Sequence, residues 1–185
     1  MDEKLLFFCN FFKNPKEIGA VVPSSRFLIK EMLKSVDFEK AKYIAEYGPG
    51  TGRITTEILN RARGDAKVLC FEVNKKFCKH LRSNIKDERL VVINDSAEVI
   101  NKHIKKLGID RLDYVICSLP FYTLGKYVKD NIINETKKAL GSRSNFISYR
   151  YLPIIDRNMN KYFPRISTKL VMLNIPPTWV DICGA

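Results

Sequence analysis

The stretch that decides the fold runs from Tyr43 to Gly52 and reads Tyr-Ile-Ala-Glu-Tyr-Gly-Pro-Gly-Thr-Gly. A short apolar run ends in a carboxylate, and three glycines then alternate with other residues before a helix-like stretch from Thr51 to Arg63. This pattern predicts a strand that turns sharply into a helix. Because glycine has no Cβ, the turn can take positive φ and let a ligand contact bare backbone. We therefore expect a nucleotide-like cofactor at the carboxyl end of the first strand of an α/β sheet.

A second carboxylate, Glu72, supports this interpretation. It directly follows an apolar run, Ala66 to Phe71, and stands 20 positions after Gly52 (72 − 52). In nucleotide-binding βαβ units, an acid at this place accepts hydrogen bonds from the ribose hydroxyls. The dinucleotide fingerprint needs a further glycine where Arg53 stands, so that pattern is not met. A plain tight connection followed by a surface glutamate is the alternative.

Composition bounds the class of protein. The chain has 185 residues, of which 45% are hydrophobic, so we expect a single domain over residues 1–185, with a helical segment at 1–35 and a core at 42–185. The net charge of +12 favours an anionic partner, either nucleic acid or a membrane surface. Five cysteines without a C-x-x-C pair predict a reducing cytoplasm and no structural metal. No apolar run reaches the roughly 18 residues of a membrane span, so any membrane contact is expected to be peripheral.

The opening segment is apolar on nearly every side. Leu5 to Phe12 carries apolar residues at helical spacing and also between those positions. It is either a lid over the cofactor or an interfacial anchor that inserts Phe8 and Phe12 below lipid headgroups. A helix then follows Ser24 or Ser25 and runs to about Ser35. Its first N–H groups contact a cofactor carboxylate or phosphate, or the serine simply caps the helix.

Two more strand ends carry polar residues. The run Leu90 to Ile93 leads into Asn94-Asp95-Ser96-Ala97, where Asp95 either reads the adenine amino group or caps a helix from Ala97 to Leu107. The histidines at positions 80 and 103 are expected to be isolated. The run Leu112 to Cys117 leads into Ser118-Leu119-Pro120-Phe121. Proline stiffens this turn, so its carbonyls can accept hydrogen bonds from an amine, as methyl transfer to nitrogen requires.

The remaining chain completes an α/β pattern. We expect a helix from Leu124 to Leu140 ended by Gly141, a strand from Ser144 to Ser148, and a closing hairpin of strands Ile166 to Asn174 and Thr178 to Cys183. Strands interleaved with helices predict a Rossmann-like seven-stranded sheet, with helices on both faces and a C-terminal antiparallel hairpin.

Several of these stretches carry a family resemblance. The motif from Glu46 to Gly52 resembles the first motif of class I S-adenosylmethionine-dependent methyltransferases. The stretches Phe12 to Arg26, Ser118 to Phe121, Ser148-Tyr149 and Asn174 to Val180 are similar to the bacterial phospholipid N-methyltransferases. This resemblance implies that methyl groups pass from S-adenosylmethionine to the amine of phosphatidylethanolamine.

Two other functions stay open. The Ser118 to Phe121 turn also resembles the Asn-Leu-Pro-Tyr turn of ribosomal RNA adenine methyltransferases, which act on RNA. Those enzymes usually carry an added helical target-binding domain that we do not expect here, and Ser118 replaces their asparagine. A protein that binds S-adenosylmethionine without catalysis is the third possibility.

The resemblance also assigns roles to residues. Those expected to bind S-adenosylmethionine are Ser24, Ser25, Glu46, Gly48, Gly50, Thr51, Gly52, Glu72, Val73, Asp95, Ser96, Ala97 and Ser118. Those expected at the reacting amine are Ser118, Leu119, Pro120, Phe121, Tyr122 and Tyr149. Those expected to contact the lipid are Phe8, Phe12 and Arg150.

Overall fold

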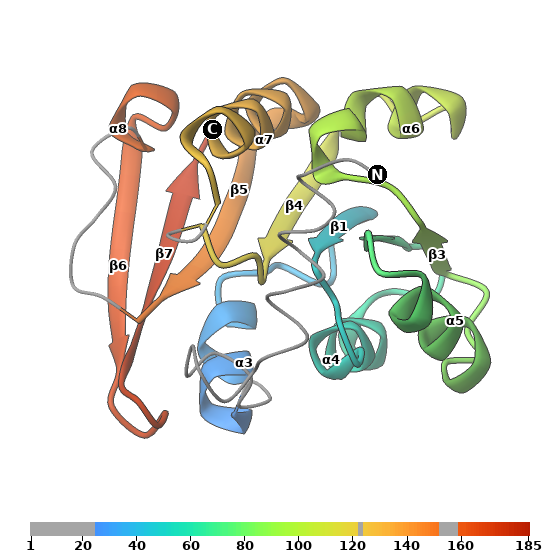
Figure 1. The fold of residues 1–185 in the computed structure, drawn as a ribbon, viewed down its shortest axis with the longest axis horizontal. Helices are drawn as coiled ribbons and strands as arrows, with labels where there is room; N and C mark the ends of the chain where they lie inside the picture. The colour runs from blue at the N-terminus through green and yellow to red at the C-terminus, as the bar shows by residue number, and fades with distance from the viewer. Residues whose placement is uncertain (1–24, 122–123, 152–158) are drawn as a thin grey trace.

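The computed structural model describes residues 25–121, 124–151 and 159–185. These residues form one seven-stranded sheet with strand order β3-β2-β1-β4-β5-β7-β6 (Figure 1). The strands are β1 (Tyr43–Tyr47), β2 (Lys67–Phe71), β3 (Leu90–Ile93), β4 (Leu112–Cys117), β5 (Leu140–Arg150), β6 (Arg165–Val171) and β7 (Thr178–Gly184). The first five run parallel, and β7 pairs antiparallel with both β5 and β6. The predicted fold class is confirmed.

Helices cover both faces of this sheet (Figure 1). On one face lie α3 (Arg26–Leu33), α4 (Arg53–Arg61) and α5 (Lys75–Asn84), and on the other lie α6 (Ile100–Lys106), α7 (Lys126–Ala139) and α8 (Met159–Tyr162). A short 3-10 helix, η1 (Ala97–Val99), leads into α6. Among the described residues, no helix is both long enough and apolar enough to cross a bilayer.

The central strand β1 is buried on both faces, which explains why its sequence is apolar apart from Glu46. Ile44 packs into the core beneath α3 and α4, whereas Ala45 and Tyr47 pack into the core beneath α7. The Tyr47 hydroxyl lies 2.9 Å from the Thr136 hydroxyl of α7, so its polar end is satisfied inside the core. The strand therefore holds the first loop of the site on a rigid base.

Several predicted boundaries are wrong. The helix expected from Ala97 to Leu107 is divided into η1 and α6. Gly141 does not end α7, because β5 begins at Leu140 and Gly141 lies within it. There the Ser144 hydroxyl accepts from the Gly141 amide and donates to the Leu112 carbonyl, which bridges a register shift and extends the strand backwards. The helix α8 was not predicted.

The β6–β7 turn, residues 172–177, also departs from the prediction. The strand expected to reach Asn174 ends at Val171. Asn174 is buried and its side-chain amide donates to the Pro176 carbonyl and the Thr178 hydroxyl, both at 2.8 Å. Its carbonyl accepts a 2.6 Å hydrogen bond from Ser25, the residue that caps α3. The turn is thereby fixed to the start of α3.

We predict that Asn174→Ala destabilises the protein by about 2 kcal/mol, because it leaves buried hydrogen-bonding groups of the turn and of Ser25 without a partner. Urea unfolding of the variant measures this loss. Substitution of the exposed Glu88 by alanine is the control, with an expected change of no more than about 0.5 kcal/mol. Equal midpoints for the Asn174 variant and the wild type would show that the turn is not held in this way.

Candidate functional site

Four loops meet at the carboxyl edge of the parallel strands. They follow β1, β2, β3 and β4, and backbone hydrogen bonds continue the ladder into them: Gly48 N–H to Phe71 O at 3.0 Å, Glu72 N–H to Ile93 O at 3.0 Å and Ser118 N–H to Tyr47 O at 2.9 Å. The loops bring together the predicted residues Glu46, Gly48, Gly50, Thr51, Gly52, Glu72, Val73, Asp95, Ser96, Ala97 and Ser118. This is the edge at which open α/β sheets bind ligands.

The three glycines of the first loop all have positive φ, at +68° for Gly48, +56° for Gly50 and +84° for Gly52. A Cβ on Gly48 would lie 2.8 Å from the Leu119 side chain, and one on Gly52 would lie 2.7 Å from Leu81. A Cβ on Gly50 would meet nothing within 4 Å. Two glycines therefore permit close packing, whereas the middle one presents bare backbone to open space.

Glu72 joins the first loop to the second. Its side chain is buried, with one oxygen accepting from the Asn74 N–H at 2.8 Å and the other from the Gly50 N–H at 3.2 Å. Burial raises the pKa of this carboxyl above its ordinary value, although these hydrogen bonds oppose the shift. The carboxylate is thus held beside the open glycine, where ribose hydroxyls are expected.

Asn94 joins the second loop to the third, a role that the sequence interpretation missed. Its side-chain amide donates to the Glu72 carbonyl at 2.8 Å and to the Val73 carbonyl at 3.1 Å. An amide side chain at a strand end, one residue before Asp95, was the available signal.

Glu46 is a buried carboxylate beneath the glycine turn. Thr55 donates a 2.6 Å hydrogen bond to its Oε2, and the Cys70 thiol lies 3.6 Å from the same atom. Its Oε1 has no hydrogen-bond partner among the described residues. Burial raises the pKa of this carboxyl to about 7. This unsatisfied acceptor lies in the strand that leads directly into the glycine turn, and its contact with the amino-acid end of S-adenosylmethionine stays a prediction.

Asp95 has a partner that the sequence did not reveal. Its Oδ2 lies 2.9 Å from His103 Nε2, and its Oδ1 accepts from the Ser96 N–H at 2.9 Å. Burial opposes ionisation, but these hydrogen bonds outweigh it, so the pKa of Asp95 lies below its ordinary value. The prediction that His103 is isolated is therefore wrong. Nor does Asp95 cap the helix, because the Ser96 hydroxyl accepts from the Glu98 N–H instead.

The Ser118 to Phe121 turn is anchored in the core. Leu119 packs against Gly48, and the Phe121 ring lies 6.0 Å from that of Phe146. The Leu119 carbonyl accepts a 2.9 Å hydrogen bond from the Phe121 N–H, so one of its two acceptor positions is used within the turn. The Ser118 hydroxyl is buried and has no partner among the described residues, so its hydrogen-bonding capacity is unused within this part of the chain.

Two further predicted residues, Tyr149 and Arg150, lie at the carboxyl end of β5, at the same edge of the sheet. Arg150 donates to Asp181 at 2.7 Å and is only 14% exposed, so its phosphate contact stays a prediction while the structure gives it a carboxylate partner. The Tyr149 ring packs edge-on against Tyr151. Ser25 caps α3 and bonds to Asn174, as its alternative interpretation expected. Phe8, Phe12, Ser24 and Tyr122 lie outside the described residues.

Comparison with known proteins identifies the family. Residues 12–140 match the model described as ribosomal RNA adenine dimethylase. The chain belongs to that family. The chain is a class I S-adenosylmethionine-dependent methyltransferase, and S-adenosylmethionine is its cofactor. The glycine turn, the two buried carboxylates and Asp95 are the features predicted to hold it. When bound, this cofactor supplies a methyl group activated by a sulfonium.

Relatives of two kinds match the chain. The ornithine lipid N-methyltransferase of Singulisphaera acidiphila is 25% identical over 99% of this chain and 96% of its own length. The ribosomal RNA small subunit methyltransferase A of Mycoplasmopsis synoviae is 29% identical over 58% of this chain, which spans 39% of that protein. Among solved structures, the chain resembles the N-methyltransferase NodS of Bradyrhizobium japonicum in complex with S-adenosylhomocysteine, with a TM-score of 0.71 at 7% sequence identity. The superposition covers 96% of this chain and 97% of NodS. That likeness shows the fold.

Glu46 should make stability depend on pH. Its pKa rises from an ordinary 4.5 to about 7, so the folded protein binds the proton more tightly and loses stability as pH rises from 4.5 through 7. We predict that Glu46→Gln is more stable than the wild type at pH 8, by up to about 3 kcal/mol, and that this difference vanishes near pH 4.5. Urea unfolding across this range measures it. A difference independent of pH would contradict the assignment.

The glycines should separate binding from folding. Gly50→Ala adds a methyl group to open space and costs about 1–2 kcal/mol of stability through its positive φ. We expect this methyl group to occupy the space predicted for the cofactor and to weaken S-adenosylhomocysteine binding at least about tenfold. Gly52→Ala incurs the same φ cost and also clashes with Leu81, so it should destabilise more. Calorimetric binding and thermal unfolding of both variants test this. If Gly50→Ala binds normally, the cofactor does not contact this turn.

Proposed function

We propose that the protein transfers methyl groups to the primary amine of a membrane lipid, with phosphatidylethanolamine as first candidate and an ornithine lipid as second. The observation that carries this proposal is the likeness to the ornithine lipid N-methyltransferase, which extends over nearly the full length of both proteins. The family match to the RNA enzymes ends at residue 140, before most of β5 and all of β7 and β6.

The Ser118 turn supports an amine acceptor. Its hydroxyl is buried without a partner among the described residues, and the turn is fixed by Leu119 against Gly48, close to the proposed sulfonium. A hydroxyl and backbone carbonyls accept hydrogen bonds from an amine and orient its lone pair for in-line displacement. Ser118 also stands where the RNA enzymes are expected to carry asparagine, whose amide would bind adenine.

The acceptor nitrogen must be neutral before it attacks. An alkyl ammonium with a pKa near 10.4 retains its proton at pH 7 by about 4–5 kcal/mol. The apolar surroundings provided by Phe121 and Leu119, both packed on the core, disfavour the charged form by desolvation. The Ser118 hydroxyl and the turn carbonyls then stabilise the neutral amine in a reactive orientation.

The direct test offers labelled S-adenosylmethionine with three acceptors: vesicles of phosphatidylethanolamine, vesicles of an ornithine lipid, and purified ribosomal RNA. We expect label in a lipid and none in RNA. Ser118→Ala should lower turnover about 10- to 100-fold and weaken S-adenosylhomocysteine binding by a smaller factor, since Ser118 is expected at both the amine and the cofactor. Label in RNA alone would refute the lipid assignment.

RNA methylation is the second candidate, supported by the family match and by the net charge of +12. The non-catalytic alternative predicts binding without label in any acceptor. A thermal-shift comparison of S-adenosylmethionine, S-adenosylhomocysteine and NAD establishes cofactor binding independently of the acceptor.

A further inference from the structure

Exposed apolar side chains gather on the β6–β7 turn. Met172 is 66% exposed, Leu173 67% and Ile175 82%, and Leu170 at the end of β6 is 47% exposed. Only two other large hydrophobic side chains in the described part of the chain are exposed, Leu107 and Tyr127. A contiguous apolar group of this kind marks an interaction site, whereas a scattered exposed residue does not.

The turn lies at the edge of the sheet that holds the proposed site. Arg150, the last residue of β5, pairs with Trp179 near the start of β7. Since β5 is parallel to β4, the turn before β7 and the Ser118 loop after β4 lie at the same edge. Three strand spacings separate β4 from β6, which amounts to roughly 14 Å. A lipid whose tails contact the turn therefore has its headgroup within reach of Ser118.

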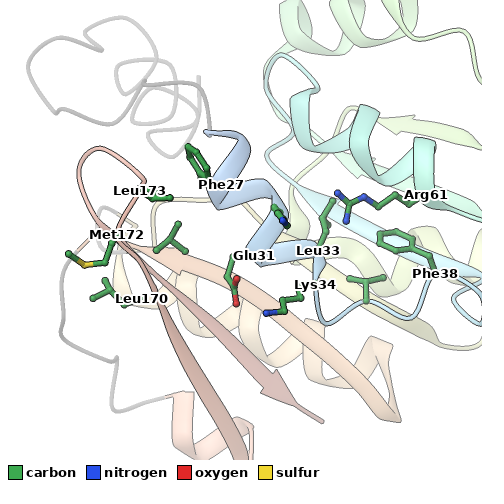
Figure 2. A pocket seen from close by; sticks show the side chains of 12 residues that line it. Phe27, Glu31, Leu33, Lys34, Phe38, Arg61, Leu170, Met172 and Leu173 are labelled. Carbon is green, nitrogen blue, oxygen red and sulfur yellow. The ribbon is translucent and has the colours of Figure 1, made fainter.

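The apolar turn borders a depression of about 630 Å³ whose lining is mainly apolar but whose charged residues are mostly cationic, here called the basic depression (Figure 2). Figure 2 shows Met172 and Leu173 at one end, Arg61 at the other, and Lys34, the residue after α3, between them. Lys30 also lines this depression. Its only acidic lining residue among those described is Glu31 on α3. Cationic side chains beside protruding apolar ones are the arrangement that binds an anionic bilayer surface.

We propose that the β6–β7 turn and the basic depression beside it form a docking surface for an anionic phospholipid bilayer. Met172, Leu173 and Ile175 enter the interface, while Lys30 and Lys34 contact lipid phosphates. The buried Asn174 holds the turn against α3, so both parts bind as one rigid surface. This inference rests on the proposed lipid function, because it gives that site its access to the acceptor.

RNA fits this surface less well. Phosphate groups would satisfy the lysines, but the aliphatic side chains of Met172, Leu173 and Ile175 offer no flat aromatic surface for stacking with bases. A second copy of the chain also fits less well, because a two-fold contact through the turn would bring Lys30 and Lys34 of both copies close together.

The test measures vesicle binding by the full chain without cofactor. The double variant M172Q/L173Q should partition onto vesicles of equal parts phosphatidylcholine and phosphatidylglycerol at least about tenfold more weakly than the wild type. The matched control is Leu107→Gln, which removes an exposed leucine at the opposite edge of the sheet and should change nothing. K30Q/K34Q should reduce the preference for phosphatidylglycerol over pure phosphatidylcholine at least about tenfold, because each lysine near an anionic surface contributes about 1 kcal/mol. Thermal unfolding verifies that the variants remain folded.

Activity on aminolipid dispersed in detergent separates this inference from the proposed function. M172Q/L173Q should retain wild-type turnover there and lose turnover on vesicles. A wild type that binds vesicles through the turn but methylates no lipid refutes the proposed function and leaves the docking surface supported. Equal vesicle binding by the wild type and M172Q/L173Q overturns the docking surface. If M172Q/L173Q binds vesicles as the wild type does but no longer dimerises or no longer binds RNA, the turn is a contact for a second copy or for RNA, and the bilayer proposal is again overturned.

Discussion

The hydrogen bond between the Gly50 N–H and the Glu72 carboxylate joins the first two loops of the site, and the site's geometry depends on it. A carboxylate offers about four acceptor positions, and two of those on Glu72 are taken by backbone N–H groups. These two bonds fix the direction of the carboxylate before any ligand arrives. The remaining positions are available to hydroxyl groups without rearrangement, which lowers the cost of binding.

The same arrangement has a cost in stability. Glu46 and Glu72 are both buried close to the glycine turn, and desolvation raises the pKa of each carboxyl. Thr55 satisfies one oxygen of Glu46, while the other has no partner among the described residues. A chain selected only for stability would place an apolar residue there. A buried carboxylate with an unused acceptor position costs stability, and a trade between stability and activity is common at binding sites.

The sequence predicted the features set by local rules. The ends of β2, β3 and β4, the positive-φ turn at Gly48 to Gly52 and the place of Glu72 follow from apolar runs, the absence of Cβ and strand order. The pair of Asp95 and His103 was missed because it requires the change from η1 to α6, which has no distinct periodicity over so few residues. The early start of β5 depends on one hydroxyl, that of Ser144, which bridges two backbone segments. No pattern within β5 itself encodes that contact.

The exposed turn shows a different limit of sequence patterns. Leu170, Met172 and Leu173 read as the end of a strand, because apolar residues at an apparent strand end are normally assigned to a core. The buried Asn174 overrides this tendency by bonding to Ser25, Pro176 and Thr178, which ends the strand early and turns the apolar side chains outward. The fold that class I methyltransferases share fixes where the cofactor lies but not the acceptor. The acceptor must be selected by what surrounds the carboxyl edge of the sheet, and here one buried amide determines what that edge presents to its surroundings.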